Sequence, residues 1–155
     1  MKLNQLSVFF ENRPGGLTVP CRVLADAGIN ILTISLADTQ QFGILRLIVR
    51  DWQKARDVLQ QSGCAVNVTE VVALGVADRP GGLAEVLGII EKVQTNLEYM
   101  YAFTFRSKGS AILVFRFEKP DQAIAALGRA GVKPISAENL FDLAEEAQRG
   151  AGGDF

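Results

Sequence analysis

The stretch Arg13-Pro14-Gly15-Gly16-Leu17 decides the fold of this chain because it occurs twice: it returns as Arg79-Pro80-Gly81-Gly82-Leu83, 66 residues later. Further residues repeat at the same spacing: Asn30 with Asn96, and Gly43 with Gly109. A run of identical residues with further matches in register indicates an internal duplication. A period of this length corresponds to a whole small domain rather than to a solenoid repeat.

Each copy of the motif follows a run of strand-forming residues, 6–10 in the first copy and 71–76 in the second, and precedes a helix-like stretch. The proline fixes φ and donates no backbone hydrogen bond, so the strand ends there. The paired glycines permit backbone angles closed to other residues and keep side chains away. We therefore expect a tight turn and a helix start with bare N–H groups, which attracts a carboxylate or a phosphate. A turn needed only for the fold would show the same residues.

The duplication predicts two domains, residues 1–69 and residues 70–148, the second with a C-terminal helix, followed by a disordered tail over 149–155. A unit of about 70 residues makes only a marginal core alone. The copies are therefore expected to pack on each other, on a second chain, or on both. The strand-like run 64–77 joins them without a flexible spacer, which predicts domains that are fixed relative to each other.

The residue types present exclude several classes of function. A net charge of −1 gives no field that attracts nucleic acid or anionic lipid. Histidine is absent, the acidic residues form no evident pair, and the two cysteines, Cys21 and Cys64, match no metal motif. We therefore expect no catalytic residue, no metal site and no cofactor. The N-terminus has no signal-peptide pattern and no apolar run spans a bilayer, so a cytoplasmic protein is expected.

The hydrophobic pattern of each copy reads strand, helix, strand, strand, helix, strand, which is the split βαβ order of ferredoxin-like folds. This places the chain in the α+β class with antiparallel sheets. The expected helices cover residues 18–27, 51–62, 84–93, 119–130 and 137–148, and a short last strand covers 132–135. Leu59 recurs at Leu127, 68 residues later, so the second copy has gained residues, which we place near Glu118-Lys119-Pro120.

Aromatic residues mark the second copy, where Tyr99, Tyr101, Phe103 and Phe105 alternate along one strand and 111–117 is apolar on both faces. A strand that is apolar on both faces is buried on both. Helices cover only one face of this fold, so a partner copy or a second subunit is expected to cover the other. An aromatic stripe can also stack nucleic-acid bases, but the lack of positive charge favours packing.

These motifs together resemble a tandem ACT-domain protein, from the small-molecule-binding regulatory modules of amino-acid metabolism. The resemblance covers residues 3–136 and includes Glu11-Asn12-Arg13-Pro14-Gly15 with Gly28-Ile29-Asn30 downstream. The segment Ala37-Asp38-Thr39 leading to Phe42-Gly43-Ile44-Leu45-Arg46-Leu47 resembles the stand-alone branch with two ACT domains. The resemblance implies two tandem βαββαβ domains with strand order 4-1-3-2. It also implies pairing of units into a continuous sheet, with amino-acid binding at the seam, and a homodimer.

The ligand site expected from the turn and the resemblance lies at both copies of the motif. An amino acid's carboxylate suits the N–H groups of the glycine turn, and Asn12 or Asp78 offers acceptors for its ammonium group. The serine-regulated dehydrogenases of the family use a His, replaced here by Phe10 and Val76. The expected ligand-binding residues are Asn12, Arg13, Pro14, Gly15, Gly16, Leu17, Asn30, Asp78, Arg79, Pro80, Gly81, Gly82, Leu83 and Asn96. Asn30 and Asn96 also have a structural reading, as asparagines that tolerate a helix-to-strand turn.

The leading hypothesis for function is a non-enzymatic sensor that binds a small ligand, probably an amino acid, and relays binding through subunit or partner contacts. The alternative is a regulatory small subunit of an amino-acid biosynthetic enzyme, because Leu6-Ser7-Val8-Phe9-Phe10-Glu11-Asn12 resembles the opening of acetolactate synthase small subunits. An enzyme acting through Cys21 or Cys64 is a third hypothesis, and neither thiol has a histidine to activate it.

Overall fold

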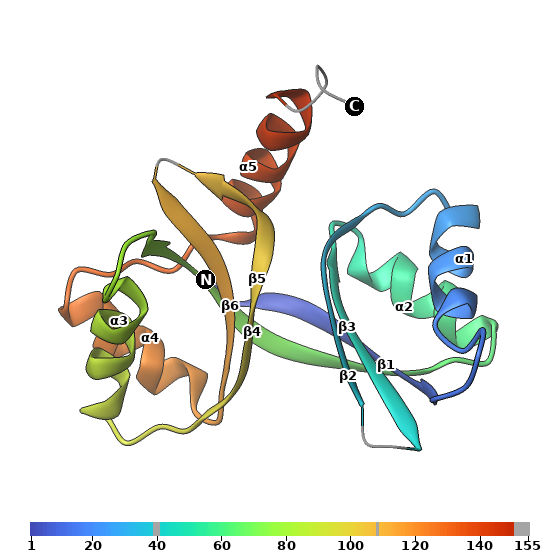
Figure 1. The fold of residues 1–155 in the computed structure, drawn as a ribbon, viewed down its shortest axis with the longest axis horizontal. Coiled ribbons are helices and arrows are strands. Elements are labelled where there is room, and N and C mark those ends of the chain that lie inside the picture. Colours follow the sequence, from blue (N-terminus) through green and yellow to red (C-terminus); the bar gives the residue numbers. More distant parts are fainter. Residues whose placement is uncertain (39–40, 108, 151–155) are drawn as a thin grey trace. The chain divides into compact units, whose positions relative to one another are not determined.

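The computed structural model describes residues 1–38, 41–107 and 109–150 (Figure 1). Its elements in chain order are β1 (Leu3–Glu11), α1 (Thr18–Asp26), β2 (Ile31–Asp38), β3 (Phe42–Val49), α2 (Trp52–Gln61), β4 (Ala65–Ala77), α3 (Gly82–Glu91), β5 (Leu97–Ser107), β6 (Ser110–Phe117), α4 (Pro120–Arg129) and α5 (Ala137–Gly150). They divide into a first unit, Asn4–Thr69, and a second unit formed by Met1–Leu3 with the chain from Glu70 onward. No helix in this described part of the chain is both long and apolar enough to cross a bilayer.

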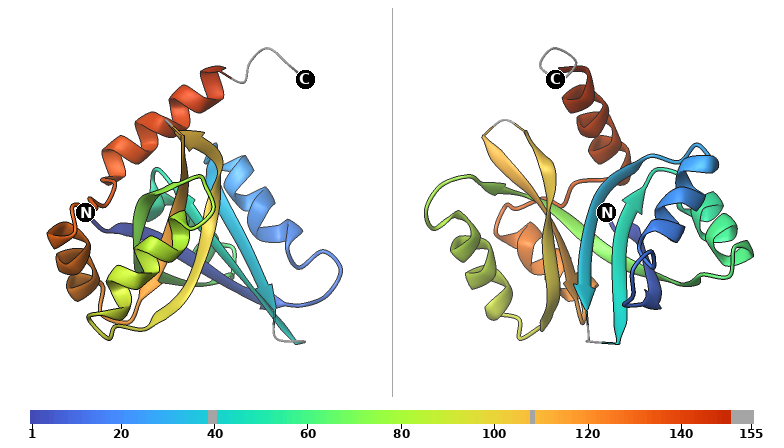
Figure 2. Two further views of the ribbon diagram at one scale, coloured as in Figure 1. Left: turned by 60° about the vertical axis from the view of Figure 1, so that its left-hand side comes forward. Right: turned by 45° about the vertical axis from the view of Figure 1, so that its right-hand side comes forward.

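The first unit is a sheet with two helices on one face (Figure 2). β3 lies between β2 and β1 and is antiparallel to both, and β4 lies next to β1. Alternation along β1 sends Leu6 and Val8 to the helix-covered face, where they pack with Leu24 of α1 and Leu59 of α2. The order β2-β3-β1-β4 is the one that the resemblance implied.

The first helix of this unit begins where the sequence predicts. Thr18 opens α1, and Pro20 lies in its first turn, where the missing N–H costs no helical hydrogen bond. Pro20 and Leu24 are the buried residues of this helix. Gly28 follows with φ of +69°, the left-handed conformation expected just after a helix end.

The second unit repeats this arrangement with an altered edge. β6 lies between β4 and β5 and is antiparallel to both, while α3 and α4 pack on one face around Phe115 and Phe117. The predicted last strand over 132–135 is reduced to a single bridge between Ile135 and Ala73 of β4. The order is therefore Ile135, β4, β6, β5, which matches the first unit position by position.

The second face of this sheet is where an expectation needs correction. A partner copy or a second subunit was expected to cover it, whereas α5 of the same unit packs against β5 on the side away from α3 and α4 (Figure 1). Leu140 and Ala144 of α5 are buried, as are Phe103 of β5 and Val114 of β6. The C-terminal helix is thus part of the core of the second unit. It runs to Gly150, so the expected disordered tail over 149–155 does not begin at 149, and residues 151–155 lie outside the described part.

The residues gained by the second copy lie in β5, not near Glu118-Lys119-Pro120 as predicted. Leu36 pairs with Leu45 in the first unit, and Ala102 pairs with Leu113 in the second. The first of these matches keeps the spacing of 66 residues, while the second has grown to 68. The ladder between β5 and β6 is irregular between Ala102 and Arg106, which locates the extra residues there.

Two further differences follow from this insertion and from the turn. Gly43 pairs with Phe10 inside β3, whereas Gly109 lies in the β5–β6 turn with φ of +76°, so the two glycines are not equivalent in structure. Ala111, which pairs with Val76, is the counterpart of Gly43. In addition, α3 begins at Gly82, ahead of the predicted start at residue 84.

Candidate functional site

The two glycines of each turn have different structural tasks. Gly15 and Gly81 adopt φ of +85° and +88°, a left-handed conformation that disfavours other residues. Gly16 has no room for a side chain, because a Cβ there would lie 2.6 Å from the carbonyl oxygen of Glu11. A Cβ at Gly82 would overlap the carbonyl group of Ala77 in the same way. The fold alone therefore requires both glycines in both copies.

The backbone amides of the turns are less available than the sequence suggested. The N–H of Gly16 donates to the carbonyl of Arg13 at 3.0 Å, and that of Gly82 donates to Arg79 at 3.0 Å. Neither α1 nor α3 has a side-chain cap at its N-terminus. Of the three amides expected to face a ligand in the first copy, at most those of Gly15 and Leu17 remain.

A pocket of about 330 Å³ lies beside the turn of the first unit. Its walls are the turn itself, the end of β1, the end of β2 and the start of β3. The lining residues are Phe10, Asn12, Arg13, Gly15, Leu17, Leu36, Asp38 and Gly43. This volume is at the lower end of the range for small-molecule sites.

Strand register explains how distant residues meet at this pocket. Gly43 of β3 pairs with Phe10 on one side and with Asp38 of β2 on the other. Leu36 pairs with Leu45, so it shares the helix-covered face with Phe10. One glycine in the middle strand therefore leaves a hollow flanked by an aromatic ring and a carboxylate.

The structure places only some of the predicted site residues in this pocket. Asn12, Arg13, Gly15 and Leu17 line it, while Pro14 and Gly16 are outside its lining. Asn30 is exposed at the opposite end of β2 from Asp38. At about 3.3 Å per residue, an eight-residue strand separates the two by roughly 25 Å. Within one unit, then, Asn30 and the pocket do not meet.

Leu36 and Asp38 are pocket residues that the sequence analysis missed. Both lie at the C-terminal end of β2, which the register brings next to the glycine turn. A polar residue at the end of a strand is the one sequence signal that pointed to Asp38. Without the register of β2 against β3, that signal could not be assigned to a site.

The second turn differs in its electrostatics. The guanidinium of Arg79 donates from Nη2 to both carboxylate oxygens of Glu85, at 2.7 and 2.9 Å. Glu85 lies in the first turn of α3, and Val19 is its counterpart in the first copy. Arg13 instead pairs with Glu11 through Nε at 3.1 Å, and both of those side chains are about 70% exposed.

The other predicted residues of the second copy surround this ion pair. Asp78, Pro80, Gly81 and Asn96 are exposed, whereas Gly82 is buried and Leu83 packs against the hydrophobic core. The backbone N–H of Asp78 donates to Gly109, and the carbonyl of Asn96 accepts from Glu118. Asn96 precedes β5 as Asn30 precedes β2, so it also stands at the far end of its strand from the turn.

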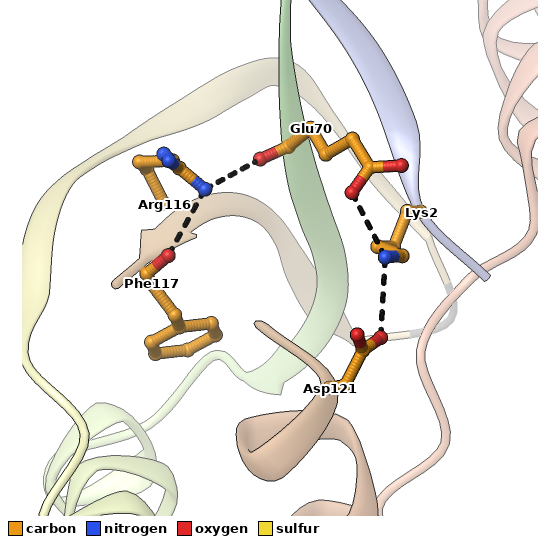
Figure 3. A network of polar contacts seen from close by, with 5 residues as sticks. All are labelled: Lys2, Glu70, Arg116, Phe117 and Asp121. Carbon is orange, nitrogen blue, oxygen red and sulfur yellow. Dashed lines mark hydrogen bonds and ion pairs between the residues drawn. The ribbon is translucent and has the colours of Figure 1, made fainter. Parts of the chain in front are cut away.

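A polar network ties the N-terminus to the second unit (Figure 3). Nζ of Lys2 lies 2.8 Å from Glu70 and 3.1 Å from Asp121 of α4. Hydrogen bonds to Glu70, and next to Asp121, raise the pKa of the Lys2 ammonium group above its usual value. Arg116 donates to the carbonyls of Glu70 and Phe117 at 3.3 and 3.0 Å. These contacts explain why Met1–Leu3 belongs to the second unit.

Neither thiol has the surroundings of a nucleophile. Cys21 and Cys64 are free and half-buried. Burial raises the pKa of the Cys64 thiol, which lowers the thiolate fraction. Within residues 1–38, 41–107 and 109–150, no three His, Cys, Asp or Glu side chains gather as they would around a metal ion.

Known proteins share this architecture. The profile of the ACT domain pair family matches residues 1–144. A solved structure from Bacteroides thetaiotaomicron is 38% identical, with a TM-score of 0.85 over 92% of this chain and 98% of that chain. Regulatory subunits of aspartate kinase from Thermus thermophilus and Thermus flavus are 18% and 19% identical, with TM-scores of 0.60 and 0.56, each over 82% of this chain and 91% of that chain.

None of the curated proteins matches the sequence. The likeness to the aspartate kinase subunits shows the fold alone. The family match and the close structural relative, together with the repeated units and their glycine turns, show that the chain belongs to the ACT domain pair family.

Proposed function

We propose that this chain is a non-enzymatic regulatory protein that binds an amino acid beside the glycine turn of its first unit and relays binding through its subunit contacts. The pocket at that turn carries the proposal. It presents the guanidinium of Arg13, the carboxylate of Asp38 and the amide of Asn12 within one small hollow. These groups complement the carboxylate and ammonium groups of an amino acid.

The free edge of β2 supports a site completed by a second copy. β2 ends the sheet on the side of the first unit, and its apolar residues Ile34 and Leu36 are 44% and 55% exposed. An edge strand of this kind invites pairing with another chain. Antiparallel pairing of two β2 strands about a two-fold axis would bring Asn30 of the partner subunit to the Asp38 end of this strand. The two expected asparagines, Asn12 and Asn30, would then face one ligand from two chains.

Thermal unfolding of the full chain against the twenty amino acids tests this function. A ligand that binds only the folded state stabilises it by about 2.7 kcal/mol at one hundred times its dissociation constant. We expect at least one amino acid to raise the midpoint of unfolding in a concentration-dependent way. An unchanged midpoint with every amino acid at millimolar concentration would refute amino-acid binding.

A second candidate is a regulatory subunit of an amino-acid biosynthetic enzyme, such as acetolactate synthase. Its support is that two proteins with the same fold are named as regulatory subunits of aspartate kinase. Affinity purification of the tagged chain from its native cells separates the two versions. Recovery with a catalytic subunit favours the regulatory-subunit version, and recovery as a homodimer alone favours the independent sensor.

A further inference from the structure

We propose that the first unit alone provides the ligand site, and that its ligand is an amino acid with an uncharged, apolar side chain. This inference rests on the function proposed above and adds the class of ligand and the number of sites per chain. It follows from the composition of the pocket and from a comparison of the two units residue by residue.

The charges of the pocket are sufficient for the main-chain groups of one amino acid and for nothing more. Arg13 and Asp38 are the charged lining residues, and they have opposite signs. The ion pair of Arg13 with Glu11 is highly exposed and therefore weak, so a ligand carboxylate can compete for the guanidinium. A charged ligand side chain would find no counter-charge left in this lining.

The remaining walls are suited to an apolar side chain. Phe10, Leu17 and Leu36 contribute hydrocarbon surface to the pocket. Leu36 is 55% exposed without a ligand, so contact with an apolar group would remove hydrophobic surface from water. Phe10 stands where the serine-regulated relatives carry a polar His, which changes the wall from polar to apolar.

The second unit lacks each of these features at the matching position. Ala111 is flanked by Val76 and Arg106, as Gly43 is flanked by Phe10 and Asp38. The insertion in β5 has therefore placed a basic residue where the first unit has an acidic one.

The remaining features of the pocket are lost as well. Ala102 replaces Leu36 at the matching register, which removes hydrocarbon surface from that wall. The guanidinium of Arg79 is already held by Glu85, a carboxylate of the same chain. The second turn therefore keeps the shape of the motif without the groups that would grip an amino acid.

Isothermal titration calorimetry of the full chain with each of the twenty amino acids tests the proposal. We expect one ligand per chain, and a dissociation constant at least about 10-fold lower for aliphatic or aromatic amino acids than for charged ones. A charged or small polar amino acid as the tightest ligand would overturn the ligand class, and two ligands per chain would overturn the single site. Either result leaves amino-acid binding intact, whereas silence across the panel removes the proposed function as well.

Two variants locate the site. Asp38→Asn should weaken binding of the preferred amino acid at least about 10-fold, while the matched control Asp142→Asn, on the exposed face of α5, should leave it unchanged. Val19→Glu places in the first copy the carboxylate that holds Arg79 in the second. It should also weaken binding, without loss of fold, because Val19 is 52% exposed. Unaltered affinity in both Asp38→Asn and Val19→Glu would contradict the assignment.

Discussion

The ring of Phe10 lies directly over Gly43, its partner across β1 and β3. A Cβ at Gly43 would overlap three carbon atoms of that ring, so the ring occupies the place of the missing side chain. The same glycine pairs with Asp38 on its other side. The contact therefore builds the floor of the pocket and sets the distance between its apolar and acidic walls.

The variant Gly43→Ala should displace the ring of Phe10 and destabilise the first unit by about 1–3 kcal/mol, the usual cost of overpacking. Chemical denaturation measures the loss. Gly75→Ala in β4 is the matched control, since its Cβ would meet Ser110 at an ordinary contact distance of 3.7 Å. We expect the control to change the free energy of unfolding by less than about 0.5 kcal/mol. Equal effects of the two variants would show that the ring is not pinned.

Gly82→Ala should cost about 1–3 kcal/mol of unfolding free energy, because the new methyl group meets a backbone carbonyl that cannot rotate away. Gly88 lies in the same helix, and its Cβ would meet no heavy atom within 4 Å. Gly88→Ala should therefore stabilise the protein by about 0.5–1 kcal/mol through helix propensity. Urea unfolding of both variants checks the opposite signs, and a tolerated Gly82→Ala would argue against a structural role for the second glycine.

A site shared between chains makes a prediction about mixed dimers. Asn30→Ala and Asp38→Asn should each weaken amino-acid binding, although the two residues lie at opposite ends of β2. In a mixed dimer one site regains both residues, so mixing the two variants should restore about a quarter of the wild-type sites. Calorimetry of the mixture after subunit exchange counts them. No recovery, with dimers confirmed by sedimentation, would place each site within a single chain.

The Cys64 thiol should react slowly in the folded protein. Burial raises its pKa above the ordinary value of 9.0, so the neutral thiol is favoured in the folded state. The associated stability is complete below 9.0 and declines as the pH rises through the higher pKa of the folded state. Alkylation followed by mass spectrometry should be slower in the native protein than in urea. The double variant Cys21→Ser, Cys64→Ser should keep full ligand binding, and a loss of function there would revive the thiol-enzyme hypothesis.

The order of elements was predictable because the duplicated motif marks a strand end and a helix start in each copy. The position of the insertion was not predictable, since two extra residues leave the alternation of a strand unchanged. Gly109 added to this error, because it matches Gly43 in spacing but serves a turn with φ of +76°. The amphipathic pattern of α5 likewise showed that the helix packs somewhere, but not on which sheet face.

The candidate site was predictable only in the part that the motif itself contains. Asn12, Arg13, Gly15 and Leu17 follow from the turn, whereas Leu36 and Asp38 come from a strand whose register the sequence does not print. The count of free amides was too high because Gly16 donates back to Arg13, a contact that depends on the turn geometry.

A crystal structure grown with the amino acid that binds most tightly tests the central claim most directly. The account predicts electron density for one apolar amino acid per chain in the first unit. Its ammonium group should lie at Asp38, its carboxylate at Arg13 and its side chain against Phe10 and Leu36. Density at the turn of the second unit, or an empty first pocket at saturating ligand, would contradict it.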